Sequence, residues 1–218
     1  MGSSMADAMA AAPRGPAYRI ETDRLVIRCY EPGDAAQFNA GLCASWDHVG
    51  EWLPFARGDQ KPSVADSLAG LRRWRGQFDL DRDYVYGIFT SDGRTFLGST
   101  GLHTRRGAGV REIGYWVHVD HIGKGYATES TAALVKVAFE VDQVRQVKIF
   151  CDVANVRSAA VPRKLGFTHE ATLREHVDNG EQARADAMLW TMLAREYAGS
   201  VPSRATVRAY DVLGELLL

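Results

Sequence analysis

The stretch HVDHIGKGYATES, residues 118–130, joins an alternating, strand-like pattern to a helical one through glycines and small side chains. Gly123, Gly125 and Ala127 leave the backbone uncovered where the helix should begin, and the free N–H groups and dipole of a helix start attract anions. A P-loop is excluded because the lysine is followed by glycine, and the dinucleotide fingerprint is excluded because Thr128 stands where its third glycine belongs. The stretch predicts a phosphate site of another kind, or only a tight turn before a helix.

Outward from this stretch, strand patterns and helix patterns follow one another along the chain. Period-two runs bounded by turn residues indicate strands, and apolar residues three and four apart indicate helices. The expected strands are residues 25–32, 84–90, 95–103, 111–119, 148–153, 168–177 and 184–193. The expected helices are residues 34–44, 64–80, 125–140 and 155–165. This order predicts one mixed α/β (α+β) sheet, with a last hairpin turning at Asp178, Asn179 and Gly180.

The composition is that of an ordinary soluble chain, without the net positive charge that would attract a polyanion. Its 218 residues are 46% hydrophobic and 24% charged, and 26 basic residues nearly cancel 27 acidic ones, leaving a formal charge of -1. Nucleic acid and anionic membranes are therefore not expected as partners. No apolar run reaches the ~20 residues of a membrane span and no signal-peptide pattern opens the chain, so a cytoplasmic location is expected.

The two ends of the chain differ in pattern from the middle. Residues 1–17 are small and aperiodic and contain two prolines, which predicts a flexible leader before a domain at 18–198. In the tail, 199–218, apolar residues recur near helical spacing and predict a short amphipathic helix. Those residues are Val207, Tyr210, Leu213 and Leu217. Docking of the tail on its own domain and on a second subunit both stay open, so a homodimer is one alternative.

Cysteine and histidine spacing argues against a metal or a disulfide framework. Cys29, Cys43 and Cys151 are too far apart for a CxxC pair and too few for a framework. Cys151 is expected to be a small buried core residue. His118 and His121 stand close together in the sequence, but no second pair completes a site, so no metal is expected.

Further motifs agree with the phosphate loop. They are EIGYWVHV at 112–119, GKGYATES at 123–130 and NVRSAAVPRKLGF at 155–167, with ETDRLVIR at 21–28, EWLPF at 51–55 and LREHVDNGEQARADAMLWTMLAREY at 173–197. Together these motifs resemble the GCN5-related N-acetyltransferase (GNAT) superfamily, in its RimJ/RimL-like branch. The resemblance implies a central, mostly antiparallel twisted sheet of about seven strands flanked by helices. It also implies that acetyl-CoA lies in the splay between the fourth and fifth strands.

The resemblance implies a set of acetyl-CoA contacts. Ile122 departs from the glutamine or arginine that opens the superfamily's pyrophosphate loop, so its backbone amide is expected to contribute there. Backbone groups of Val117 and Val119 are expected to pair with the pantetheine arm. Asn155 matches the asparagine that hydrogen-bonds the pantetheine, and Ser158 matches the hydroxyl near the thioester sulfur. The expected cofactor-binding residues are Val117, Val119, Ile122, Gly123, Lys124, Gly125, Tyr126, Ala127, Thr128, Asn155 and Ser158.

Acetylation of an amine by a thioester needs a neutral amine and a leaving thiolate that can be protonated. Around pH 7.4 an α-amine is ~10–30% neutral and a lysine amine ~0.1%, a deficit of ~4 kcal/mol for lysine. Glu112 matches the general-base glutamate of the superfamily's histone acetyltransferases, and Ser158 is expected to hydrogen-bond the departing sulfur. The alternatives are a strand glutamate paired with an arginine of a neighbouring strand, and local helix capping by Asn155 and Ser158.

The acceptor groove of the superfamily is built around the two early helices. Trp52 and Phe55 flank a proline in the loop between those helices and are expected as groove walls. Glu175, near the end of the penultimate strand, is expected to border the acceptor pocket, or else to be solvated.

The resemblance implies an N-acetyltransferase that transfers acetyl from acetyl-CoA directly to a primary amine. Members of the branch act on N-terminal α-amines of ribosomal proteins, on aminoacyl conjugates and on small amines including antibiotics. A protein N-terminus of the ribosomal type is therefore the first candidate acceptor, and a small-molecule, antibiotic or aminoacyl-conjugate amine is the alternative. An alternative from another functional class is a non-catalytic acyl-CoA sensor with the same fold.

Overall fold

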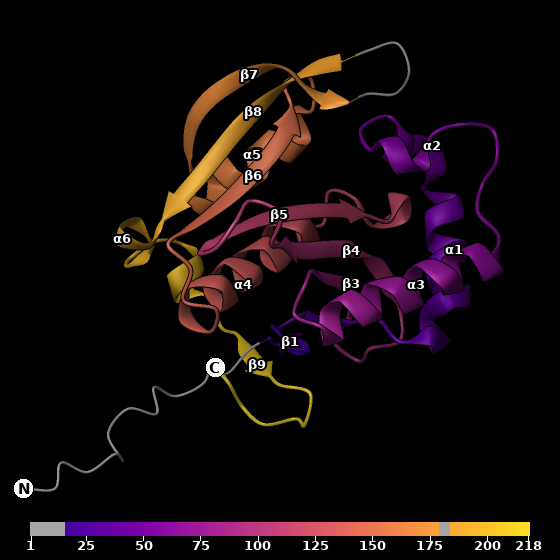
Figure 1. The fold of residues 1–218 in the computed structure, drawn as a ribbon, viewed down its shortest axis with the longest axis horizontal. Helices are drawn as coiled ribbons and strands as arrows, with labels where there is room; N and C mark the ends of the chain where they lie inside the picture. Colours follow the sequence, from indigo (N-terminus) through magenta and orange to yellow (C-terminus); the bar gives the residue numbers. More distant parts are fainter. Residues whose placement is uncertain (1–15, 179–183) are drawn as a thin grey trace, which may run out of the picture.

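The computed structural model describes residues 16–178 and 184–218, which form one nine-stranded sheet with helices on both faces (Figure 1). The strands are β1 (Arg19–Glu21), β2 (Leu25–Cys29), β3 (Tyr84–Thr90), β4 (Phe96–His103), β5 (Val110–Val117), β6 (Gln146–Asp152), β7 (Thr168–Asp178), β8 (Arg184–Leu193) and β9 (Arg208–Tyr210). The α-helices are α1 (Ala35–Ala44), α2 (Trp46–Gly50), α3 (Val64–Asp79), α4 (Tyr126–Glu140), α5 (Val156–Leu165) and α6 (Ala194–Tyr197). The expected mixed α/β fold with a mostly antiparallel sheet is confirmed, and β1 and β9 raise the strand count above seven.

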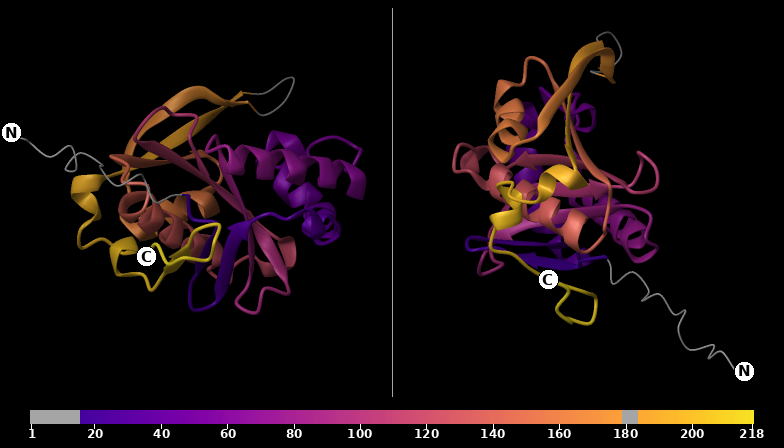
Figure 2. Two further views of the ribbon diagram at one scale, coloured as in Figure 1. Left: turned by 60° about the horizontal axis from the view of Figure 1, so that its bottom comes forward. Right: turned by 90° about the vertical axis from the view of Figure 1, so that its left-hand side faces the viewer.

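The sheet runs in the order β7-β8-β6-β5-β4-β3-β2-β1-β9 and separates two hydrophobic clusters. In β6, Val147, Ile149 and Cys151 are buried on one face while the residues between them are half-exposed. That face belongs to the cluster that α4 and α5 cover. The other cluster is aromatic and joins α1 and α3 to the sheet, with Phe38 packed edge-on against Phe96. Figure 2 shows the helical layers from two further directions.

The strands β5 and β6 run parallel but separate after a short pairing. They are joined only over Val110–Glu112 and Gln146–Lys148. Beyond that point β5 stays on β4 as far as Val117, while β6 continues along β8. Residues 114–117 are therefore half-exposed in the middle of the sheet. The gap lies between the fourth and fifth strands as counted from the sequence pattern.

The prediction of a helix in the tail is wrong. Residues 199–218 contain β9, which pairs antiparallel with β1. Val207 and Ala209 are buried with an exposed Arg208 between them, which is a period of two, whereas Leu213 of the helical pattern is 82% exposed. The outer edge of β1 decides this outcome, because its backbone N–H and C=O groups find partners in a strand that a helix does not supply.

The start of the chain joins the fold earlier than expected. Of the leader predicted at 1–17, residues 1–15 lie outside the described residues, but Ala17 is fully buried and its carbonyl accepts a hydrogen bond from the Tyr86 hydroxyl at 3.0 Å. Asn179 and Gly180 of the predicted last turn also fall outside the described residues. In the part of the chain that the structure describes, no helix is long and apolar enough to cross a membrane.

Candidate cofactor and acceptor site

The loop between β5 and α4 has the geometry of an anion site. Gly123 and Gly125 adopt positive φ angles of 75° and 84°, and Gly125 is the N-cap of α4. A Cβ atom built on Gly123 would meet nothing within 4 Å, so the loop is open there. The N–H of Glu129 donates to the Gly125 carbonyl at 3.0 Å and is the first to bond within the helix. The amides before it are available to a ligand.

The other residues expected at this loop surround the glycines. Ile122 is 37% exposed, and the Lys124 ammonium donates to the Asp120 carbonyl at 3.0 Å and lies 3.2 Å from Nδ1 of His121. Burial and the Lys124 charge lower the pKa of His121, so the ring adds no positive charge near pH 7. The first turn of α4 is formed by Tyr126, Ala127 and Thr128, all half-buried.

Arg24 is a second cation at the loop, which the motif pattern did not indicate. Its guanidinium donates to the Lys124 carbonyl at 3.1 Å and lies 4.9 Å from the centroid of the Tyr126 ring. It also forms an ion pair with Glu129 at 2.5 Å, and the Thr22 hydroxyl donates to that carboxylate at 2.6 Å. These contacts fix the segment just before β2 to the first turn of α4. The available signal was the motif ETDRLVIR itself.

The free edge of β5 carries the backbone groups expected to meet the pantetheine arm. The His118 N–H donates to a β4 carbonyl at 2.8 Å, so by strand alternation the backbone groups of Val117 point away from β4, into the splay. Val117 therefore presents its backbone N–H and C=O groups to the splay. The N–H of Val119 instead donates to the buried Ser45 hydroxyl at 3.0 Å, which commits that amide to the protein.

Asn155 and Ser158 lie together at the start of α5. Asn155 is the N-cap, and its side-chain oxygen accepts the Ser158 N–H at 2.9 Å, which is the capping role foreseen for it. Among the described residues, its side-chain NH₂ group has no hydrogen-bond partner, so both donors remain for a ligand. The Ser158 hydroxyl lies 3.1 Å from the hydroxyl of Tyr115 on β5. Burial raises the pKa of Tyr115 well above its usual range, so this phenol stays protonated.

Cys151 lies on β6 in the cluster that α4 and α5 cover. Its side chain is buried, and burial raises the pKa of the thiol although Ser158 and Trp190 act in the opposite direction. A thiol kept protonated in this way is a poor nucleophile, which agrees with the core role expected for it.

Glu112 lies where β5 leaves β6, but two arginines hold its carboxylate. One oxygen accepts from Arg105 and the other from Arg106, both in the loop between β4 and β5. The side chain is 7% exposed. Burial raises the pKa of Glu112, but the two arginines outweigh burial and hold it below its usual value. This is the structural alternative considered for Glu112, except that the arginines come from a loop, and a carboxylate held in this way is a weak base.

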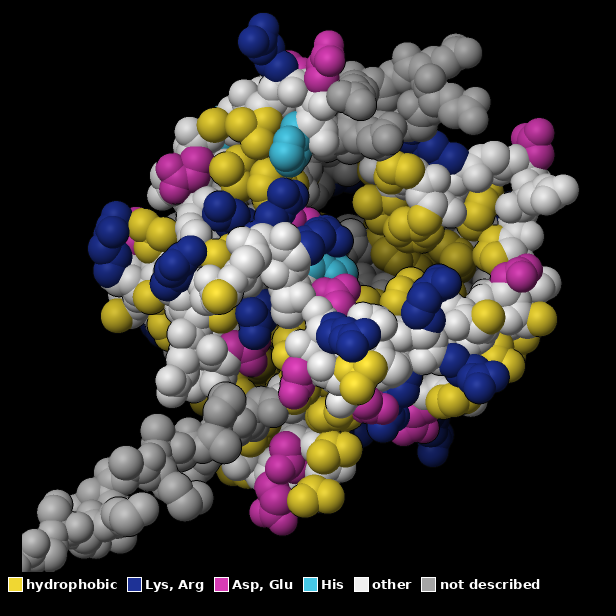
Figure 3. Space-filling model, in the orientation of Figure 1, with side chains coloured by type: hydrophobic (Ala, Val, Ile, Leu, Met, Phe, Trp, Pro, Cys, Tyr) yellow, Lys and Arg dark blue, Asp and Glu magenta, His cyan; other side chains and the backbone are white. Residues whose placement is uncertain are grey.

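A hollow opens between the β7–β8 hairpin and the α1–α2 segment (Figure 3). Hydrophobic side chains line one wall, and charged and histidine side chains lie at its base. Trp52 and Phe55 follow α2, the first half-buried and the second 56% exposed. Glu175 is exposed on β7, where its N–H donates to the Asp186 carboxylate at 3.0 Å. The three expected acceptor residues thus lie on elements that flank the hollow.

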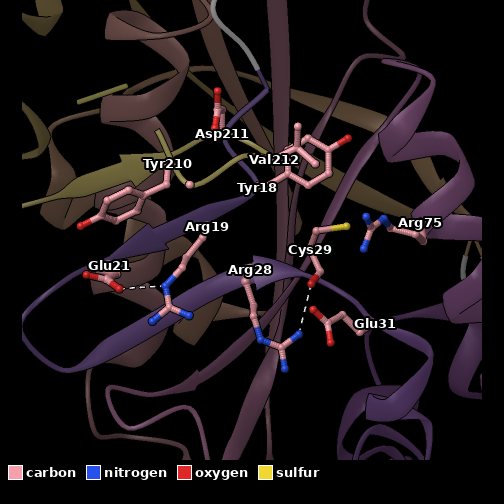
Figure 4. A pocket seen from close by; sticks show the side chains of 11 residues that line it. Tyr18, Arg19, Glu21, Arg28, Cys29, Glu31, Arg75, Tyr210, Asp211 and Val212 are labelled. Carbon is pink, nitrogen blue, oxygen red and sulfur yellow. Dashed lines mark hydrogen bonds and ion pairs between the residues drawn. The ribbon is translucent and has the colours of Figure 1, made fainter. Parts of the chain in front are cut away.

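A separate cavity of about 490 Å³ lies near the other edge of the sheet, where β1, β2, α3 and the segment after β9 meet (Figure 4). Most of its charged side chains already have partners, such as Arg19 with Glu21 at 2.8 Å and Arg28 with Asp34 at 2.7 Å. The strands β3 and β4 separate it from β5. Neither there nor elsewhere in the described part of the chain do three His, Cys, Asp or Glu side chains gather as a metal site requires.

Known proteins are similar to this chain in sequence and fold. A family model described as an acetyltransferase (GNAT) domain matches residues 24–168. The "Putative ribosomal N-acetyltransferase YdaF" of Bacillus subtilis is 31% identical over 181 residues, which is 81% of this chain and 95% of that protein. Mycobacterium smegmatis RimJ in complex with CoA-disulfide has a TM-score of 0.75 at 26% identity, covering 83% of this chain and 87% of its own. RimL, a ribosomal L7/L12 acetyltransferase in complex with coenzyme A, is alike in fold, with a TM-score of 0.71 at 18% identity over 80% of this chain and 97% of its own.

Proposed function

The chain belongs to the GNAT acetyltransferase family and is an acetyl-CoA-dependent N-acyltransferase, and we propose that its acceptor is the N-terminal α-amine of a protein of the ribosomal type. The observation that carries the proposal is the likeness, over most of both chains, to a protein named as a ribosomal N-acetyltransferase. The hollow beside the β7–β8 hairpin supports it, because an extended peptide end needs an open groove.

The residues present fit acetyl-CoA, which supplies the acetyl group as an activated thioester. The open loop at Gly123 and Gly125 and the free amides of the first α4 turn suit the pyrophosphate, with Arg24 beside them. The edge of β5 at Val117 and the free NH₂ group of Asn155 suit the pantetheine arm. Together these groups would hold the thioester in the splay.

In this proposal Ser158 acts on the leaving group. Its hydroxyl donates a hydrogen bond to the sulfur as the C–S bond breaks, because a serine hydroxyl is too weakly acidic to give up its proton at neutral pH. An α-amine suits such a site, since a sizeable fraction is neutral near pH 7.4 and little base is needed. A lysine side chain would need far more help than the arginine-bound Glu112 can give.

The test is a panel of acceptors incubated with acetyl-CoA, read by release of free thiol and by the mass of the product. The panel contains peptides with free N-termini that differ in the first residue, the same peptides with a blocked N-terminus and an internal lysine, and small amines. We expect acetylation only of peptides with a free N-terminus. Turnover confined to small amines would overturn the peptide acceptor and assign the alternative of a small-molecule acetyltransferase.

A further inference from the structure

His103, at the end of β4, forms a hydrogen-bonded pair with Asp83 that the chemistry above does not use. Its Nδ1 lies 2.9 Å and 3.1 Å from the two carboxylate oxygens, and the Thr104 N–H donates to the same group at 3.3 Å. Burial raises the pKa of Asp83, but the hydrogen bond from His103 helps to hold it below its usual value. An ionised carboxylate only accepts, so Nδ1 carries a proton and Nε2 of the neutral ring carries the lone pair.

Two glycines place the ring of His103 at the splay. A Cβ atom on Gly101 would lie 2.7 Å from Nε2, and one on Gly114 would lie 3.5 Å from it. These glycines are cross-strand partners in β4 and β5, so their bare backbone lets the ring lie over β5. Gly114 follows closely on Glu112, the last β5 residue paired with β6. Within residues 16–178 and 184–218, Nε2 has no hydrogen-bond partner, and the side chain is 16% exposed.

The ring of His103 lies on the opposite face of β5 from Ser158. Side chains alternate along a strand, and Tyr115 reaches Ser158 on α5 while Trp116 packs in the aromatic cluster of α1 and α3. Gly114 shares the face of Trp116. A thioester held in the splay would thus have the sulfur-binding hydroxyl on one side and a free imidazole nitrogen on the other, which suits an amine that approaches opposite the groups around the leaving thiolate.

We propose that His103 is the general base for the acceptor amine and that Asp83 orients it. One ammonium proton passes to Nε2, and the neutral amine then forms the C–N bond to the acetyl carbon. As the C–S bond breaks, a second proton from the attacking nitrogen passes to the thiolate, directly or through water, and the imidazolium returns its proton to solvent. The inference rests on the acetyltransferase function but not on which amine is the acceptor.

The carboxylates around the His103 ring are already bound and do not compete with it as the general base. Asp83 is bound to Nδ1, and Glu112, the cross-strand partner of His103, is bound by Arg105 and Arg106. Lys148 on β6 pairs in register with Glu112. Among the imidazole and carboxylate atoms of this group in the described residues, Nε2 is therefore the one without a partner.

The test compares His103→Gln with the wild-type enzyme in acetylation of a peptide α-amine over about pH 6 to 9.5. Glutamine can keep a hydrogen bond to Asp83 but cannot take a proton. We expect kcat/KM to fall about 10²-fold near pH 7 and to recover toward high pH, where the amine is already neutral. The ratio of wild-type to variant kcat/KM should therefore shrink as the pH rises and the acceptor amine becomes neutral without help. His169→Gln, on the exposed part of β7, is the matched control and should keep wild-type activity.

Two further measurements separate catalysis from folding. Acetyl-CoA affinity and thermal unfolding of the His103→Gln variant should match the wild type. Asp83→Asn keeps His103 but removes the negative charge beside it, so this variant should lose less activity near pH 7 than His103→Gln. A His103→Gln enzyme within about twofold of wild-type kcat/KM near pH 7, or one that loses the same factor at every pH, overturns the proposal and leaves the acetyltransferase function intact. A wild-type enzyme that acetylates no amine would instead overturn the function, and this inference with it.

Discussion

The hydroxyl of Tyr115 lies 3.0 Å from the carbonyl oxygen of Ser158 and 3.1 Å from its side-chain oxygen. In a regular helix that carbonyl would accept the N–H four residues on, but this residue is Pro162, which has none. Tyr115 supplies the missing donor from β5. Because a carbonyl only accepts, the Tyr115 proton points to it, and without a ligand the Ser158 hydroxyl donates to the Tyr115 oxygen. In the proposed reaction the Ser158 O–H turns from Tyr115 to the sulfur. The proline inside α5 is thereby linked to the orientation of the hydroxyl proposed to serve the sulfur.

Replacing the tyrosine hydroxyl should reveal this link. Tyr115→Phe leaves the Ser158 carbonyl without a donor, and we expect the free energy of unfolding to fall by about 1–2 kcal/mol. In a Pro162→Ala background the new N–H can serve the carbonyl, so the same substitution should cost less than half as much. Urea unfolding of the two single variants and the double variant measures the coupling. Strictly additive costs would show that the carbonyl does not join the two residues.

Asn155 has two separable roles. Asn155→Ala removes the cap on the Ser158 N–H, and we expect it to lower stability by about 1 kcal/mol and also to weaken acetyl-CoA binding. Asn155→Asp keeps the capping oxygen but loses the NH₂ donors, so it should keep wild-type stability and still bind acetyl-CoA about tenfold more weakly. Calorimetric titration and thermal unfolding measure both quantities. Wild-type affinity in Asn155→Asp would leave only the capping role.

Arg24 should matter for the phosphates and not for the acyl arm. We expect Arg24→Gln to raise the dissociation constant of acetyl-CoA about three- to tenfold, because a cation beside the loop is lost, and to leave acetyl-pantetheine binding unchanged. The matched control is Arg19→Gln, on the neighbouring strand β1, where the partner of Arg19 is Glu21. Equal weakening of both ligands would mean that Arg24 only holds the loop in shape. Titration of each ligand at low and high salt makes the comparison.

The carboxylate of Glu112 should support the fold more than the chemistry. Because its pKa in the folded state lies below the usual 4.5, its stabilisation is fully present above that value and is lost as the pH falls through the folded-state pKa. We expect Glu112→Gln to be less stable than wild type at pH 7, to lose less of its stability below about pH 4.5, and to slow α-amines and lysine-like amines equally. Thermal unfolding across pH checks the first two points. A larger loss for lysine-like amines would restore Glu112 as the base.

Much of the fold and several local features of the candidate site follow from local sequence. The glycines at 123 and 125 and the cap at Asn155 each act within one turn, so the motif and the structure agree on them. The bounds of the predicted strands and helices also agree closely, because each depends on a period that a short window carries. The short elements β1, α2 and α6 were not predicted. Val119 is the exception in the loop, since its amide is taken by Ser45 from a distant helix end.

The sequence by itself determined the order of most strands and helices, the open glycine loop before α4 and the family likeness, because these depend on residues close together in the chain. Only the tertiary structure decided the strand in the tail, which forms because β1 offers an edge. It alone also brought Arg24 to α4 and placed the ring of His103 over Gly114. These contacts depend on the register of the whole sheet, which every strand helps to set, so no short window of sequence contains them.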